Sequence, residues 1–228
     1  MAERKKSKAD PTSDNVVVIG LGRFGGQVAE SLLFLGHEVM GVDENTRIVQ
    51  QWSDRLTHVV QADSTDEDAL TQVGIREFSR AVVGIGTDIE ASVLTVLTLS
   101  ELGLPEIWAK AISVKHGKIL TSVGAHHVIY PEATMGERVA RLIASRLLDL
   151  VDLGDGDAIA TVRPPRDAVG RTIADLGVRT TYGVTIVGIK TPGAGVAWAT
   201  PQTVVPDGGA LIVSGSVDQV QRFATAQE

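Results

Sequence analysis

Short runs of apolar and β-branched residues recur along the first 130 positions, separated by segments whose apolar residues have a helical spacing. The runs predict buried strands, and apolar residues at i, i+4 and i+7 predict amphipathic helices. Six strands are expected, at residues 16–19, 38–42, 58–60, 81–85, 107–109 and 127–130. Strands that alternate with helices form a parallel sheet covered on both faces. We therefore predict a doubly wound α/β fold, with a six-stranded Rossmann-like sheet over residues 15–133.

Helical spacing marks three connections between these strands and a longer segment after the sixth. The three helices are expected at Val28, Leu32 and Leu35, at residues 89–99 and at residues 112–123. The longer helix is expected over residues 134–148, with an apolar stripe formed by Met135, Val139, Leu142, Ile143 and Leu147. No strand is expected directly after it. Either a second domain or another subunit must therefore cover the stripe.

The pattern changes after VDLGDGDA at residues 151–158, an acidic, glycine-bearing stretch that predicts a domain boundary. We therefore assign residues 134–154 to a crossover helix and linker, and residues 155–228 to a second domain. Short strands are expected there at residues 159–162, 185–189, 196–199 and 211–213, with helices at 171–176 and 217–226. These elements predict a small α+β domain.

Composition excludes several classes of protein. The 228 residues include no cysteine, which removes disulfides, thiolate metal sites and cysteine nucleophiles. The formal net charge is −7, so the overall field repels nucleic acid and no nucleic-acid partner is expected. No apolar run approaches the roughly 18 residues that span a bilayer. The charged residues 1–14 predict a disordered leader and not a signal peptide.

The strongest chemical signal is VVVIGLGRFGG at residues 16–26, in which Gly20, Gly22 and Gly25 have the spacing G-x-G-x-x-G. The first glycine permits a tight turn, the second lets backbone approach a phosphate, and the third lets the following helix pack close to the strand. Phosphate would then meet N–H groups at the positive end of that helix. The motif follows an apolar strand and precedes an amphipathic helix, so it predicts a nucleotide site more than a turn without a ligand.

Three nearby residues carry chemistry but leave alternatives open. Asp43 ends the second strand, where a carboxylate accepts hydrogen bonds from ribose hydroxyls and repels a 2′-phosphate, which disfavours NADP. The alternative is an exposed aspartate that caps the next helix. Asn45 either caps that helix or adds a ribose contact. Arg23 either folds over phosphates or is a solvated residue of the first helical turn.

Residues for redox or hydrolytic chemistry are missing. Neither Tyr130 nor Tyr182 is followed four positions later by lysine, as in one common hydride-transfer site. The five histidines form no metal signature, and the chain has neither G-x-S-x-G nor a P-loop. Glu132 follows the sixth strand, where such sheets bind ligands, although a carboxylate that favours the helix dipole is the simpler interpretation. A small NAD-dependent oxidoreductase or NADH sensor is the alternative function.

The chain closely resembles one known family in GLGRFGG, HEVMGVDEN, QADSTDEDALTQVGI, VGIGTDIEASVLTVLTLSELG, IWAKA, YPEATMGERVA and TIADLGVRTTYGVTIVGIK. The family is that of the cytoplasmic regulatory subunits of Ktr-type potassium uptake systems, TrkA-family proteins with regulator-of-potassium-conductance (RCK) N and C domains. The resemblance covers residues 15–225. It implies a gating subunit and not an enzyme, which binds ATP or ADP, with NAD or NADH as alternative ligands. It also implies dimers that assemble into an octameric ring beneath a membrane potassium-transporting partner.

The resemblance also implies which residues bind the nucleotide. Those of the glycine turn hold phosphates, those after the second strand hold ribose, and those after the third lie at adenine. Glu132 approaches the γ-phosphate from the neighbouring subunit, with a cation such as Mg, Na or Ca. The full set is Gly20, Gly22, Arg23, Phe24, Gly25, Asp43, Asn45, Asp63, Ser64, Thr87, Glu90, Lys110 and Glu132.

Some relatives bind cyclic di-AMP between two C-terminal domains. The matching residues here are Ile173, Ala174, Asp175 and Arg179, of which Arg179 is expected to pair with a phosphate. Ala174 departs from the pattern, because binders tend to carry a larger aliphatic residue there. The alternative is an ordinary dimer-interface helix.

Overall fold

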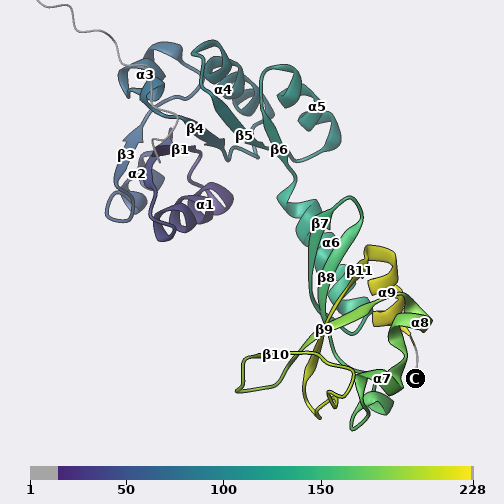
Figure 1. The fold of residues 1–228 in the computed structure, drawn as a ribbon. Helices are drawn as coiled ribbons and strands as arrows, with labels where there is room; N and C mark the ends of the chain where they lie inside the picture. Colours follow the sequence, from purple (N-terminus) through teal and green to yellow (C-terminus); the bar gives the residue numbers. More distant parts are fainter. Residues whose placement is uncertain (1–14, 227–228) are drawn as a thin grey trace, which may run out of the picture. The chain divides into compact units, whose positions relative to one another are not determined.

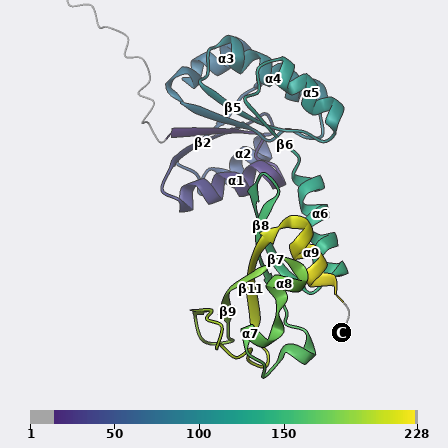
Figure 2. The same ribbon diagram turned by 45° about the vertical axis from the view of Figure 1, so that its right-hand side comes forward.

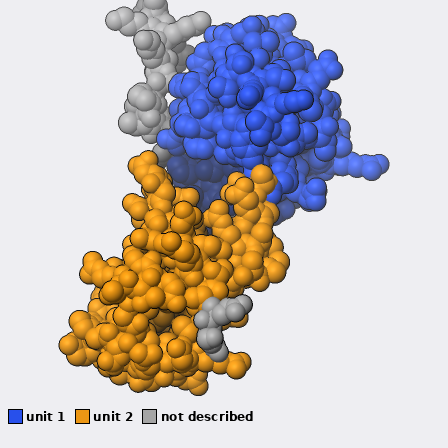
Figure 3. All heavy atoms as spheres, turned by 90° about the vertical axis from the view of Figure 1, so that its right-hand side faces the viewer, with its two compact units in different colours: residues 1–132 blue, residues 133–228 orange. Residues whose placement is uncertain are grey.

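The computed structural model describes residues 15–226 of the chain. Two compact units, residues 1–132 and residues 133–228, are drawn in different colours in Figure 3. Each unit has its own buried apolar core, so each is described by itself. The predicted leader at residues 1–14 lies outside the described residues.

The first unit contains a six-stranded parallel sheet with the order β3-β2-β1-β4-β5-β6 (Figure 1). Its strands are β1 (Asn15–Ile19), β2 (Glu38–Asp43), β3 (His58–Gln61), β4 (Arg80–Val83), β5 (Glu106–Lys110) and β6 (His127–Ile129). The predicted doubly wound sheet is therefore confirmed. The strand order reverses between β1 and β4, and such sheets bind ligands at that point, outside the carboxyl ends of the strands.

Helices cover both faces of this sheet, with α1 and α2 on one side and α3, α4 and α5 on the other (Figure 2). They are α1 (Arg23–Phe34), α2 (Thr46–Trp52), α3 (Glu67–Gln72), α4 (Ile89–Glu101) and α5 (Val114–Ser122). Val17 and Ile19 of β1 belong to the core under α3–α5, whereas Val16 and Val18 belong to the core under α1 and α2. The uninterrupted apolar run of β1 follows from this burial on both faces.

In the first unit, apolar spacing gave no bounds for α2 and α3, although a helix after the second strand was expected from its capping residues, and one residue was misplaced. Asn45 caps α2 and Asp66 caps α3, and each side chain accepts a hydrogen bond from the first turn of its helix. Helices of 7 and 6 residues are too short to show a clear apolar period. Leu35 was expected on the buried face of α1, but it follows the last helical residue and is 70% exposed.

The second unit contains a five-stranded antiparallel sheet with the order β10-β9-β11-β8-β7. Its strands are β7 (Leu147–Gly154), β8 (Asp157–Val162), β9 (Thr185–Lys190), β10 (Val196–Trp198) and β11 (Ala210–Ser216). Its helices are α6 (Pro131–Ala144, which begins in the first unit), α7 (Ile173–Leu176), α8 (Val178–Tyr182) and α9 (Val217–Thr225). A capping box between Ser216 and Gln219 starts α9, which buries Val220 and Phe223 in the core.

The segment after α6 corrects the prediction. The helix ends at Ala144, and the edge strand β7 follows almost directly, where no strand was expected and a linker was assigned. VDLGDGDA does not separate domains. It contains the turn of the β7–β8 hairpin, in which Asp155 and Gly156 have positive φ angles of 53° and 85°. The sequence did not predict this strand, because Leu147 is its only buried residue and its apolar and polar residues therefore alternate weakly.

The apolar stripe of α6 is largely exposed in the single chain. Met135, Val139 and Ile143 are 54%, 44% and 81% exposed, respectively, whereas Leu142 packs against the core of the second unit. No residue of α6 is buried.

Candidate functional site

The first unit has a cleft of about 460 Å³ where the carboxyl ends of its strands meet. Segments distant in sequence line it: the glycine turn after β1, the ends of β2 and β5, the segments after β3 and β4, and the first turn of α6. The predicted residues that line it are Gly20, Gly22, Arg23, Phe24, Asp43, Asn45, Asp63, Ser64, Thr87, Lys110 and Glu132. Gly25 lies beneath the turn, and Glu90 is an exposed residue of α4 outside the lining.

Close packing of the glycine turn requires two of its glycines. Gly20 has a φ of +83°, which favours glycine. A Cβ on Gly25 would lie 1.9 Å from the carbonyl oxygen of Gly20, so only glycine lets α1 approach β1 this closely. A Cβ on Gly22, in contrast, would meet nothing within 4 Å. Gly22 therefore faces open space at the start of α1, as the motif's second glycine does when backbone approaches a phosphate.

The start of α1 has the electrostatics of an anion site. Gly22 is its N-cap residue and provides no side-chain cap, and the first turn has no acidic residue. The orphan N–H groups and the positive end of the helix dipole are therefore not offset by a carboxylate within the first turn of α1. Arg23, the first helical residue, adds a positive charge to the lining.

Asp43 is held rigidly at the end of β2. Its Oδ2 accepts a hydrogen bond from the Leu21 N–H at 2.8 Å, and its Oδ1 accepts one from the Asn45 N–H at 2.9 Å. The residue is only 9% exposed. These bonds tie the glycine turn to the β2–α2 connection and fix where the carboxylate lies. Asn45 caps α2 through its Oδ1, which accepts from the Arg47 N–H at 3.0 Å, and its ribose contact stays a prediction.

The segment after β3 is also preorganised. Asp63 Oδ1 accepts hydrogen bonds from the N–H and hydroxyl of Thr65, at 2.9 and 2.7 Å, and the hydroxyl bond is the larger cause of its lowered pKa. Ser64 is 8% exposed, and its Oγ lies 2.8 Å from the Thr95 Oγ1. Both side chains therefore have fixed positions, and their role at adenine stays a prediction.

Lys110 and Glu132 form an ion pair within the cleft, with Nζ 2.6 Å from Oε1. The Lys110 side chain is 12% exposed and the Glu132 side chain 68%. The Lys110 Nζ lies 5.6 Å from the ring centroid of Phe24, and a Cβ on Gly86 would lie 3.2 Å from that nitrogen. The hydrogen bond from Lys110 is the largest cause of the lowered pKa of Glu132, and the charge of Arg23 adds to it.

Sequence reasoning missed two glycines in this site. Gly84 follows β4, and a Cβ there would lie 2.9 Å from the Gly20 carbonyl oxygen, so it allows the ends of β1 and β4 to approach. Gly86 leaves room for the Lys110 side chain. The signal was Gly84 inside the predicted strand 81–85 and Gly86 directly after it, since a glycine in a strand marks a close approach of backbone.

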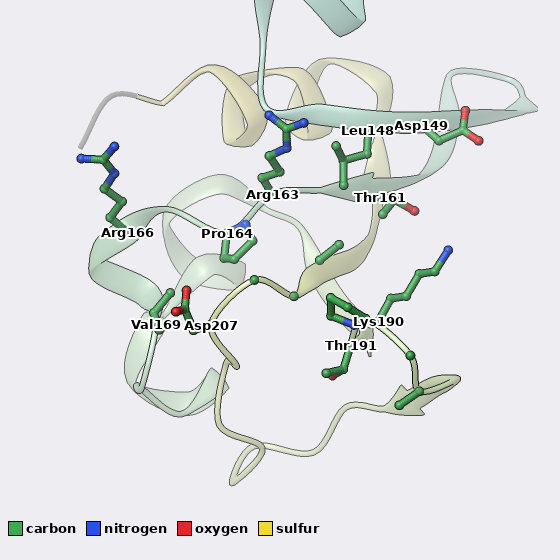
Figure 4. Close-up of a pocket in the computed structure, with 16 residues that line it drawn as sticks. Leu148, Asp149, Thr161, Arg163, Pro164, Arg166, Val169, Lys190, Thr191 and Asp207 are labelled. Atoms are coloured by element: carbon green, nitrogen blue, oxygen red, sulfur yellow. The ribbon is translucent and has the colours of Figure 1, made fainter.

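The second unit has a cavity that its predicted ligand residues do not line. That cavity, of about 730 Å³, lies between the β9–β10 connection, the ends of β7 and β8, and the 3-10 helix η2 (Arg166–Ala168) (Figure 4). Among its lining residues are Arg163, Arg166 and Lys190, but none of the four predicted residues. The Asp175 Oδ2 instead accepts a hydrogen bond from the Thr172 hydroxyl at 2.6 Å, and the cyclic di-AMP site stays a prediction.

Residues 15–226 lack two features. No helix in that range combines the length and hydropathy needed to cross a bilayer. Within the same range, no group of three or more histidine, aspartate or glutamate side chains is placed to hold a metal ion.

Comparison with known proteins identifies both parts of the chain. The TrkA-N domain family matches residues 16–131, and the TrkA-C domain family matches residues 158–226. The chain is 39% identical to the Ktr system potassium uptake protein A of Bacillus subtilis (strain 168), over 90% of this chain and 93% of that protein. It is 37% identical to the Ktr system potassium uptake protein C of the same strain, over 90% and 94%.

Solved structures agree with the fold. The GsuK channel bound to NAD superimposes with a TM-score of 0.65 and 20% identity, over 96% of this chain and 40% of that one. GsuK bound to ADP superimposes with a TM-score of 0.51 and 18% identity, over 57% of this chain and 34% of that one. At these identities the likeness concerns the fold alone.

Proposed function

We propose that this chain, a member of the TrkA family, senses ATP and ADP and gates a membrane potassium transporter. The premise is that the chain is a regulatory RCK subunit of a Ktr potassium uptake system and not an enzyme. One observation carries the proposal. The cleft brings together the N-terminus of α1, whose first turn holds no acidic residue, and two cationic side chains, Arg23 and Lys110. Free N–H groups at a helix N-terminus and cationic side chains are the groups that bind the phosphates of a nucleoside polyphosphate.

The rest of the cleft fits the other parts of a nucleotide. Asp43 presents a fixed carboxylate to ribose hydroxyls and would repel a 2′-phosphate. Asp63 and Ser64 follow β3 and line the same cleft, and we place adenine beside them. NAD and NADH share the adenosine half, and we retain them as alternative ligands.

We further propose that Glu132 approaches the terminal phosphate from the neighbouring subunit and meets a cation such as Mg, Na or Ca there. A carboxylate beside a polyphosphate is repelled unless a cation lies between them. Glu132 and the phosphates would together supply the oxygen ligands that these cations require. ATP would then differ from ADP in how it engages Glu132, and this difference is what a sensor of the two nucleotides needs.

The exposed stripe of α6 supports a homo-oligomer. Met135, Val139 and Ile143 leave an apolar surface that a second copy would bury. We propose dimers that assemble into an octameric ring, which lies at the inner face of the cell membrane through its potassium-transporting partner. Nucleotide can change the ring only by binding its two states with different affinity.

Calorimetry of the purified protein with ATP, ADP, NAD and NADH tests this function. We expect tight binding of ATP and ADP and weaker binding of NADH. Arg23→Gln should weaken ATP binding, whereas Arg47→Gln should not, because Arg47 is an exposed cation near the site that does not line the cleft. Strong preference for NADH, or equal effects of the two substitutions, would count against ATP sensing.

A further inference from the structure

The Lys110–Glu132 pair is asymmetric, and this asymmetry has a consequence for ligand binding. The Lys110 side chain is mostly buried, with its end packed beside Gly86 and its Nζ near the Phe24 ring. Its ammonium group is therefore confined to the cleft and needs an anion there. Glu132 is two-thirds exposed on the first turn of α6 and can turn into water with little loss of solvation.

We propose that Lys110 exchanges partners when nucleotide binds, giving up the Glu132 carboxylate for a phosphate and leaving Glu132 free to bind a cation. This proposal rests on the nucleotide site proposed above and adds a residue that couples phosphate binding to the cation. Glu132 is the member of the pair that moves, because its side chain is 68% exposed whereas that of Lys110 is 12% exposed.

Charge decides the direction of the exchange. A carboxylate brings one negative charge to Lys110, whereas a di- or triphosphate brings several, and Lys110 lines the same cleft as the N-terminus of α1. Once phosphate neutralises Lys110, the Glu132 carboxylate faces phosphate charge without a cation of its own. It must then move away or bind an added cation.

In this exchange, the cation site at Glu132 forms only after nucleotide has bound. Before nucleotide binds, Lys110 already neutralises Glu132, which then offers little to a metal ion. After binding, Glu132 and the phosphates together form an oxygen-rich site. Lys110 therefore acts as a positioning residue that keeps the cation site closed until phosphate arrives.

A double-mutant cycle on ATP affinity tests the exchange, with divalent cations chelated. The four proteins are the unaltered chain, Lys110→Met, Glu132→Gln and the double variant. Methionine keeps the aliphatic stem beside Gly86 and Phe24, and Lys110→Gln serves if that variant does not fold. Glu132→Gln removes the phosphate repulsion in either background, but it removes the need to break the ion pair only when Lys110 is present.

We therefore expect Glu132→Gln to raise ATP affinity more with Lys110 present than in the Lys110→Met background. The two gains should differ by up to about 5-fold, the range measured for exposed ion pairs. Equal gains in both backgrounds would mean that the pair survives nucleotide binding, which overturns the exchange and leaves nucleotide sensing intact. Absence of ATP binding by the unaltered, folded chain would instead overturn the nucleotide site itself.

The second unit provides a matched control. Arg138 and Asp149 form an exposed ion pair, with Nη2 2.7 Å from Oδ1, outside the cleft. The same cycle with Arg138→Met and Asp149→Asn should give no coupling to ATP affinity. Coupling of equal size there would show that the Lys110–Glu132 result reflects general charge effects, and would overturn the exchange.

Discussion

Two substitutions in the glycine turn should have different effects: Gly25→Ala should lower stability, and Gly22→Ala should weaken ligand binding. In Gly25→Ala, the new Cβ would lie 1.9 Å from the Gly20 carbonyl oxygen and 3.1 Å from its carbonyl carbon. Both atoms are backbone, so the contact can be relieved only by moving α1 away from β1. In Gly22→Ala, the new Cβ would meet no protein atom within 4 Å, and φ at this position is −64°, which alanine adopts readily.

The magnitudes follow from these contacts. Overpacking against an unyielding neighbour costs about 3 kcal/mol at the upper end of its usual range. Alanine inside a helix is more favourable than glycine by about 1 kcal/mol, which offsets part of this cost. Gly25→Ala should therefore lower the free energy of unfolding by about 2 kcal/mol, or about 30-fold in the equilibrium constant. Gly22→Ala should cost no more than about 1 kcal/mol, the value of a weaker N-cap residue.

Urea unfolding followed by circular dichroism measures the first effect, and ATP calorimetry measures the second. We expect Gly22→Ala to remain folded but to bind ATP about tenfold more weakly or worse, because its methyl group occupies the path of the phosphates. If Gly25→Ala is as stable as the unaltered chain, α1 does not pack against the turn as described. If Gly22→Ala binds ATP normally, the phosphates do not pass over Gly22 and the proposed orientation of the nucleotide is wrong.

Three further predictions concern other parts of the chain. Glu132→Gln should reduce the cation-dependent difference between ATP and ADP affinity; unchanged affinities with and without Mg²⁺ or Na⁺ would refute its role. Burial lowers the pKa of His116 below its usual 6.5, so the unfolded chain takes up a proton that the folded chain excludes. The urea midpoint should therefore fall as pH drops below about 6.5, and it should fall less in His116→Asn. In the second unit, Arg179→Ala should abolish binding of cyclic di-AMP measured by calorimetry, and retained binding would exclude Arg179 as the phosphate partner.

The fold of the first unit was readable from sequence because its strands are buried on both faces. The run VVVI of β1 serves two cores at once and leaves no polar position to obscure the strand. The strand β7 was not readable for the opposite reason. It lies at a sheet edge with one buried residue, and its acidic, glycine-bearing end looks like a linker although it is a hairpin turn.

The sequence predicted those site residues that lie close together in one continuous segment. Gly20, Gly22 and Gly25 have a spacing that only a strand–turn–helix unit explains, and the structure places them in one. The Lys110–Glu132 pair joins residues 22 positions apart on different elements, so no local pattern announces it. Gly86 had no assigned role for the same reason, since its neighbour Lys110 comes from an adjacent strand.

A sensor needs an element that connects its ligand to the rest of the chain, and α6 meets this condition by continuity alone. Glu132, the last residue of the first unit, lies in the first turn of α6, and the helix continues to Ala144 within the second unit. The Glu132 carboxylate would have a different partner in each state, Lys110 in one and a cation in the other, and so a different position relative to the first turn of α6. Under the proposed function, nucleotide would act through a difference of this kind, because a ligand with equal affinity for both states shifts neither. If nucleotide gates the transporter as proposed, the free energy available is the difference in nucleotide affinity between the two states, whatever the total affinity for ATP.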